Sequence, residues 1–139
     1  MLERESLGTG WCRLRNQQGE MLYRSTGPGT ALLICAQKVG DEFTPELLAQ
    51  LDQEFGWAPR LRLFIDLTEV TAYGAELRQG ITDWLVKNRH RVDALVLVKK
   101  GALVEMAARV ASHLTGGRVQ VTRDRSEFEG RLQGTSKAA

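Results

Sequence analysis

Few side chains in this 139-residue sequence have the types and spacing that catalysis requires. A cysteine nucleophile needs a neighbouring base, and the two histidines, His90 and His113, both lie near the C-terminal ends of predicted helices. A histidine there more simply interacts with the last helix carbonyls and the helix dipole. Cys35 lies within an apolar run, where a thiol usually behaves as a small hydrophobic side chain. We therefore expect no catalytic residues and a protein that is not an enzyme.

Metal and phosphate sites are also not indicated by the spacing of their usual ligands. The sequence has no His-x-x-x-His, no Cys-x-x-Cys and no Asp-rich loop. The glycine pairs at 8–10 and 27–29 both precede predicted strands, whereas a phosphate-binding loop connects a strand to a helix. We expect no metal and no cofactor.

Polar side chains at the end of the predicted strand 61–67 form the candidate binding site. In open α/β sheets, ligands favour the crevice at the carboxyl ends of the strands. The alternative is that the first two of these residues only bond nearby backbone and shape a turn. The candidate binding residues are Asp66, Thr68, Thr71, Tyr73 and Gly74.

The composition suits one globular domain. Hydrophobic residues make up 42% and charged residues 26%, and the net charge of +2 excludes a strongly cationic nucleic-acid-binding surface or an acidic disordered tail. Residues 78–125 are locally basic, with ten Lys and Arg against four Asp and Glu. That segment is either a solvated face or a surface for an acidic protein or anionic ligand. Aromatic and basic residues do not interleave, so we expect no nucleic-acid partner.

The localisation expected from the sequence is cytoplasmic. The first ten residues lack the apolar core of a secretion signal, and no stretch approaches the ~20 apolar residues that span a bilayer. Two cysteines are too few for a disulfide framework.

Alternating apolar runs and amphipathic stretches predict an α/β fold with a mostly parallel sheet. An N-terminal antiparallel hairpin is predicted over residues 11–23, and Thr44 followed by Pro45 predicts a helix N-cap. The single domain is expected to span residues 9–133, with flexible ends at 1–8 and 134–139. Predicted strands are 31–36, 61–67, 93–98 and 119–121, and the four predicted helices are 44–55, 75–91, 103–114 and 124–132.

The stretch from Ala31 to Leu132 resembles the SpoIIAA-like branch of the STAS superfamily. The resemblance rests on ALLICAQKVGDEFTPE, on LRLFIDLTEV with its Asp-Leu-Thr turn, and on the strand, helix, strand and helix pattern after residue 92. It implies a bacterial regulatory module that binds another protein. STAS switch proteins carry a phosphorylatable serine after this strand, but residues 70–75 contain none, so we expect no phosphorylation switch. Thr71 is the remaining hydroxyl that could accept phosphate.

Two further hypotheses concern ligands and self-association. The fold is also similar to CRAL-TRIO domains, which implies as an alternative a small-molecule or lipid carrier with a cavity between helices and sheet. Trp84 in the apolar stripe of the helix at 75–91 and the edge of the N-terminal hairpin predict a homodimer. The alternative for Trp84 is packing within its own chain.

Overall fold

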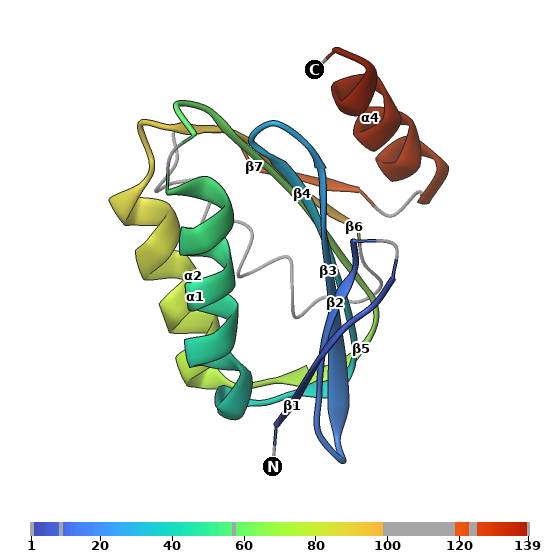
Figure 1. Cartoon of the computed structure of the whole chain (residues 1–139), viewed down its shortest axis with the longest axis vertical. Coiled ribbons are helices and arrows are strands. Elements are labelled where there is room, and N and C mark those ends of the chain that lie inside the picture. Colours follow the sequence, from blue (N-terminus) through green and yellow to red (C-terminus); the bar gives the residue numbers. More distant parts are fainter. Residues whose placement is uncertain (1, 9, 57, 99–118, 123–124, 139) are drawn as a thin grey trace.

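A twisted sheet runs through the centre of the molecule (Figure 1). The computed structural model describes residues 2–8, 10–56, 58–98, 119–122 and 125–138. Within these residues the sheet has seven strands, arranged in the order in which they occur in the sequence. The strands are β1 (Glu3–Ser6), β2 (Cys12–Arg15), β3 (Gly19–Gly27), β4 (Thr30–Val39), β5 (Leu61–Tyr73), β6 (Val92–Val98) and β7 (Val119–Thr122).

The direction of strand pairing changes at β4. β1 to β4 form an antiparallel meander, whereas β4 to β7 pair in parallel. The α/β class and the predicted N-terminal hairpin, formed by β2 and β3, are confirmed, but the sheet is not mostly parallel, because half of the strand pairs are antiparallel. The hairpin gains a strand on each side, β1 and β4. Parallel strands need a long crossover, and the helices predicted after β4 and β5 provide it.

Both chain ends contain regular structure where the sequence indicates flexible segments. β1 lies within residues 1–8 and pairs with β2, and Glu5 and Glu3 form ion pairs with Arg13 and Arg15. A half-buried strand is predicted from alternating apolar residues. All four residues of β1 are exposed and none is apolar, so the sequence of β1 lacks this pattern. At the other end, the last helix continues to Ala138.

Helices lie on both faces of the sheet. α1 (Thr44–Phe55) and α2 (Ala75–Lys87) cover one face, and α4 (Arg125–Ala138) lies against the other (Figure 1). The predicted helices at 44–55, 75–91 and 124–132 are confirmed in type, whereas the one predicted at 103–114 lies outside the described residues. The result is a three-layer α/β/α domain.

The start of α1 differs from the predicted Thr44 cap. A short 3-10 helix, η1 (Asp41–Phe43), precedes α1, so Phe43 occupies the N-cap position. Thr44 is therefore inside the first turn, and its buried hydroxyl has no hydrogen-bond partner in the described structure. Pro45 still lies in the first turn, where its missing N–H has no cost.

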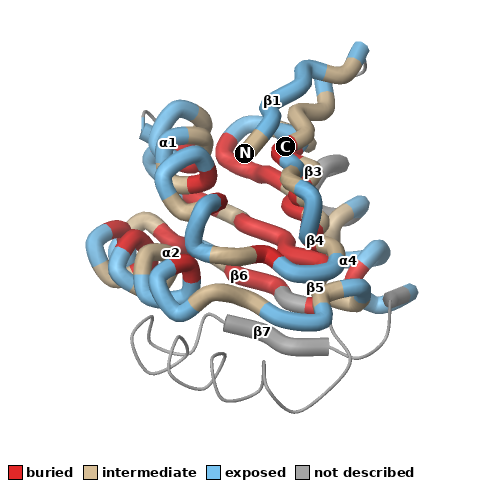
Figure 2. Tube along the Cα trace, turned by 90° about the horizontal axis from the view of Figure 1, so that it is seen from below, coloured by how far each residue is buried: buried red, intermediate tan, exposed pale blue. Residues whose placement is uncertain are grey.

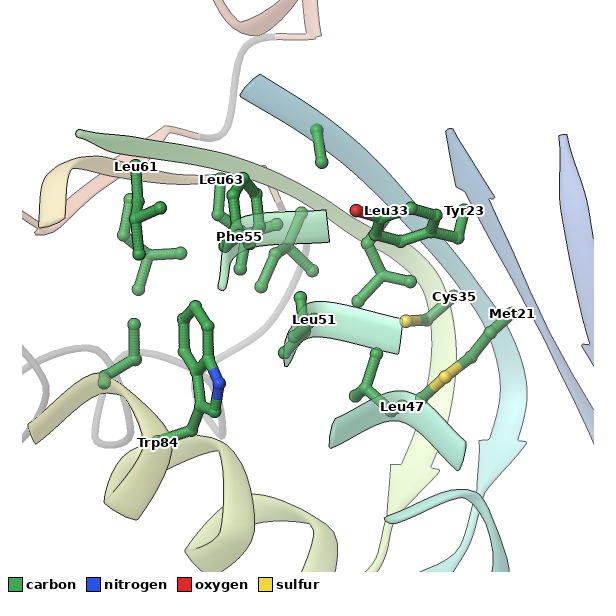
Figure 3. Packing of buried hydrophobic residues seen from close by; sticks show 14 of the residues in the cluster. Met21, Tyr23, Leu33, Cys35, Leu47, Leu51, Phe55, Leu61, Leu63 and Trp84 are labelled. Atoms are coloured by element: carbon green, nitrogen blue, oxygen red, sulfur yellow. The ribbon is translucent and has the colours of Figure 1, made fainter. Parts of the chain in front are cut away.

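The main hydrophobic core fills the layer between α1, α2 and the sheet (Figure 3). Apolar residues at helical spacing on α1 meet alternating residues of β3, β4 and β5, so that both periodicities bury their apolar faces. Figure 2 shows the buried residues concentrated on the central strands and the inner sides of both helices. The residues least exposed to solvent in this layer include Met21, Leu33, Phe43, Leu47, Leu51, Phe55 and Leu61.

A smaller cluster anchors α4 on the opposite face. Phe128 of α4 packs edge-on against Phe64 of β5, with ring centroids 5.7 Å apart. Val96 and Val98 of β6 complete the buried part, and Leu32 packs at its border. Among the described side chains, those of β4 to β6 contribute to this cluster, and α4 also lies near the backbone of β7.

Candidate functional site

The strand that carries the candidate residues is longer than its apolar run predicts. β5 continues from Leu61 through to Tyr73, so the predicted turn after Asp66 is wrong. Its pairing with β6 ends at Asp66 opposite Val98, while its pairing with β4 continues to Tyr73 opposite Val39. The residues after Asp66 stay extended because β4 supplies backbone partners, and Val70, Thr71 and Tyr73 are of types that favour strands.

Asp66 and Thr68 form a local hydrogen-bonded unit inside this strand. The Asp66 carboxylate accepts from the Thr68 backbone N–H at 3.0 Å and from the Thr68 hydroxyl at 2.7 Å. An extra residue of β5 lies between the pairs formed by Ile34 and Ala36 of β4, so these bonds hold a β-bulge. Asp66 is only 2% exposed. The Asp66 side chain thus bonds nearby backbone, as this alternative expects, but in a bulge and not in a turn, and a binding role of Asp66 and Thr68 stays a prediction.

Thr71, Tyr73 and Gly74 lie further along, at the junction of β5 and α2. Thr71 is exposed, whereas Tyr73 and Gly74 are half-buried. The Gly74 N–H donates to the carbonyl of Val39 at 2.9 Å, and the Gly74 carbonyl accepts the first helical bond of α2 from Arg78. These three predicted residues thus share one surface, from which Asp66 is excluded by its burial.

Asp41 joins this surface from a distant part of the sequence. Its carboxylate accepts from the backbone N–H groups of Glu76 at 2.9 Å and Leu77 at 3.3 Å. It thereby caps α2, whose own N-cap residue, Gly74, has no side chain. A Cβ on Gly74 would lie 1.9 Å from the Asp41 Oδ1 atom, so glycine is required for this contact. Sequence reasoning missed Asp41, because a cap supplied 35 residues away from its helix has no local spacing signal.

Removing this cap is expected to destabilise the domain. Asp41→Ala should lower the free energy of unfolding by about 1 kcal/mol, because two backbone donors of α2 lose their acceptor. Asp41→Asn keeps an acceptor oxygen and should cost less. Urea denaturation measures both, with Gln53→Ala on the exposed side of α1 as the control. An Asp41→Ala variant as stable as that control would contradict the capping role.

The cysteines and histidines do not form a nucleophilic pair in the described part of the chain. Cys35 is 4% exposed, and its burial, together with the charge of Asp66, raises the pKa of its thiol to about 12. A protonated thiol in the core is a poor nucleophile. His90 lies on the surface after α2, and His113 lies outside the described residues. Residues 2–8, 10–56, 58–98, 119–122 and 125–138 also contain no cluster of three or more His, Cys, Asp or Glu residues arranged to hold a metal.

The basic segment is divided between structural and exposed charges. The Arg91 guanidinium donates to the carbonyls of Phe55 at 2.9 Å and Ala58 at 2.8 Å, so it is used inside the fold. Lys87 and Arg89 are exposed. The other predicted members lie where the structure describes no side chains: Lys99, Lys100, Arg118, Arg123 and Arg125.

Trp84 packs within its own chain. It is 7% exposed, its indole N–H donates to the Asp52 carboxylate at 2.9 Å, and its ring centroid lies 6.0 Å from that of Phe55. The alternative of internal packing is therefore confirmed, and Trp84 gives no support to the predicted homodimer. Buried side chains of the main core lie in the layer where the carrier hypothesis places its cavity (Figure 3), and that hypothesis stays a prediction.

The comparisons with known proteins establish the fold class. A solved structure of an uncharacterized protein from the DUF3478 family, from Shewanella loihica PV-4, has a SpoIIAA-like fold and superposes with a TM-score of 0.59. The match covers 95% of this chain and 92% of that one, at 18% sequence identity. This chain therefore has a SpoIIAA-like fold, which confirms the fold that the sequence resemblance implies. No family model and no curated protein sequence matches the chain. None of the helices in the described ranges is long and apolar enough to cross a membrane.

Proposed function

We propose that this chain is a non-enzymatic, bacterial, cytoplasmic module of the STAS-like type that binds another protein through the junction of β5 and α2. We call this junction the β5–α2 surface and define it by Thr71, Tyr73, Gly74 and Glu76. The observation that carries the proposal is that β5 extends beyond its pairing with β6 and delivers these residues to the start of a helix.

The form of the surface favours a protein partner over a small ligand. Thr71, Ala72, Ala75 and Glu76 are exposed, so they present a broad contact area in which no residue is deeply enclosed. Asp41 holds the helix start in place, which reduces the ordering cost of binding.

The same geometry argues against control by phosphate. A helix N-terminus attracts anions, but here the Asp41 carboxylate already occupies the N–H groups of Glu76 and Leu77. A phosphate on Thr71 would add further negative charge to this junction, and residues 70–75 contain no serine as an alternative acceptor. The module therefore binds without a phosphorylation switch.

A quantitative pull-down from native bacterial lysate tests the proposed surface. Thr71→Arg and Tyr73→Ala should each reduce the captured partner about tenfold or more, because surface contacts at the centre of an interface carry most of its affinity. Gln53→Arg on α1 is the control, since it adds the same charge on another exposed surface. Unchanged capture by both variants, with thermal unfolding like that of the wild type, would remove the β5–α2 surface from consideration.

A further inference from the structure

β1 lies at one end of the described sheet and buries none of its own side chains. Among the described strands it pairs with β2 alone, and all four residues from Glu3 to Ser6 are exposed. β4, in contrast, places Ala31, Leu33 and Cys35 in the main core. Burial of apolar surface is the main stabilising term in folding, so β1 is attached with far less free energy than the centre of the sheet.

Two ion pairs add to the backbone pairing between β1 and β2. Glu3 lies opposite Arg15, and the Arg15 Nε atom is 3.4 Å from the Glu3 carboxylate. Glu5 lies opposite Arg13, whose guanidinium donates a hydrogen bond to it and lowers the pKa of the Glu5 carboxyl. Arg13 also lies 3.9 Å from Glu20 of β3, so one arginine serves two carboxylates. The side chains of both pairs reach solvent, and dissolved salt therefore screens them.

On the opposite side of β1, two contacts connect the N-terminal segment to α1 and the core. Side chains alternate along a strand, so Arg4 faces away from both glutamates. Its guanidinium donates to the Gln50 side chain of α1 at 3.0 Å. Leu2, directly before β1, is half-buried against the main core. The segment from Leu2 to Ser6 therefore lies along the border of the main core, between β2 and α1.

The connection between β1 and β2 contains two glycines. Gly10 has a φ of +83°, a conformation that favours glycine, and a Cβ on Gly8 would meet no other atom within 4 Å. Glycine rotates with few steric limits, so this connection can act as a hinge while β2 keeps its pairs with β3. The short tether also makes reclosure fast, because β1 stays close to the edge that it left.

We infer that β1, together with Leu2, is an ionic strap. It closes over the edge of β2 and the border of the core, and it opens as a unit, without unfolding of the domain, when salt screens its ion pairs. While closed, it occupies the edge at which another strand would add to β2. The flexible N-terminus indicated by the sequence and the paired strand of the structure are then the open and closed states of one segment. This inference does not depend on the β5–α2 surface.

Hydrogen exchange of the purified full chain, followed by NMR at low and high salt, tests the strap. At low salt, the amides that bond β1 to β2 should exchange about tenfold faster or more than those within β4, which exchange only when the core opens. About 1 M NaCl should accelerate the β1 amides about threefold or more relative to those of β4, because it screens both ion pairs. The double variant Glu3→Gln with Glu5→Gln should reach this faster rate at low salt and respond little to added salt.

A second double variant is the matched control. Glu46→Gln with Asp83→Asn removes two carboxylates from exposed positions on α1 and α2, and it should leave exchange in β1 unchanged.

Four results would overturn the inference. The first two are β1 amides as protected as those of β4, which would show that β1 opens only with the whole domain, and β1 amides that are unprotected even at low salt, which would show that the strap does not close. The third is exchange that neither salt nor the Glu3 and Glu5 changes accelerate. The fourth is equal acceleration by both double variants, which would assign the effect to net charge. Because only purified protein is used, failure to capture a partner from lysate does not bear on the outcome.

Discussion

Phe55→Ala is expected to lower the free energy of unfolding by about 3–5 kcal/mol, the range found for large-to-small changes in a packed core. The side chain has no solvent exposure and lies in the last turn of α1. Its ring packs against that of Trp84, so truncation would open a cavity between the two helices and the sheet. Few single changes in this domain remove so much buried surface at one point.

Chemical denaturation measures this loss, and tryptophan fluorescence reports its location. Phe55→Leu keeps most of the apolar volume and should cost clearly less, while Gln53→Ala nearby on the exposed side of α1 should be close to neutral. The Trp84 contribution to the emission of the chain's three tryptophans should shift to longer wavelength in Phe55→Ala if water enters the vacated space. A loss below about 1 kcal/mol would show that the layer repacks and that Phe55 does not anchor α1.

Elements with strong periodicity could be predicted from the sequence. The stripe of Leu47, Leu51 and Phe55 predicted α1, and its members are all buried in the structure. The apolar residues Leu63, Phe64 and Ile65 likewise predicted the central part of β5, which has a strand on each side. In both cases hydrophobic burial determines the element, and burial leaves a pattern in the local sequence.

Elements held by backbone pairing alone could not be predicted. β1 and the polar end of β5 are strands because a neighbour satisfies their N–H and C=O groups, and neither buries a regular apolar face. Their strand character depends on where the neighbouring strand lies. A local window of sequence contains no record of that position.

The candidate site divides in the same way. Proximity to the end of an apolar strand selected Thr71, Tyr73 and Gly74, which lie together at the junction of β5 and α2. Burial of Asp66 and the contribution of Asp41 both depend on residues far away in the sequence. The charge of a side chain thus indicates which groups it can hydrogen-bond. Whether it bonds another molecule or the backbone of its own chain depends on the fold.

Arg91 illustrates this point with the second large effect that we expect. Its position among Lys87 and Arg89 predicted a basic surface, yet its guanidinium lies over the C-terminal end of α1. It donates to the carbonyls of Phe55 and Ala58, both of which belong to nearly fully buried residues. It also donates to the side-chain oxygen of Asn88, whose amide in turn donates to the carbonyl of Trp84 at 2.8 Å. One side chain therefore joins the ends of α1 and α2 just before β6.

Arg91→Met should lower the free energy of unfolding by about 3 kcal/mol, because the part-buried carbonyls of Phe55 and Ala58 lose a charged donor. Arg91→Lys keeps the charge but offers one ammonium in place of a planar fork, so its stability should lie between those of Met and Arg. Arg89→Met is the matched control: Arg89 is exposed and donates to the Val86 carbonyl at 3.0 Å, so we expect a change within about 0.5 kcal/mol. Urea denaturation of the three variants compares their free energies of unfolding directly.

Equal stability of Arg91→Met and Arg89→Met would mean that Arg91 belongs to the solvated basic surface. A large loss of stability in Arg91→Met that Arg91→Lys restores in part would establish Arg91 as the link between α1 and α2.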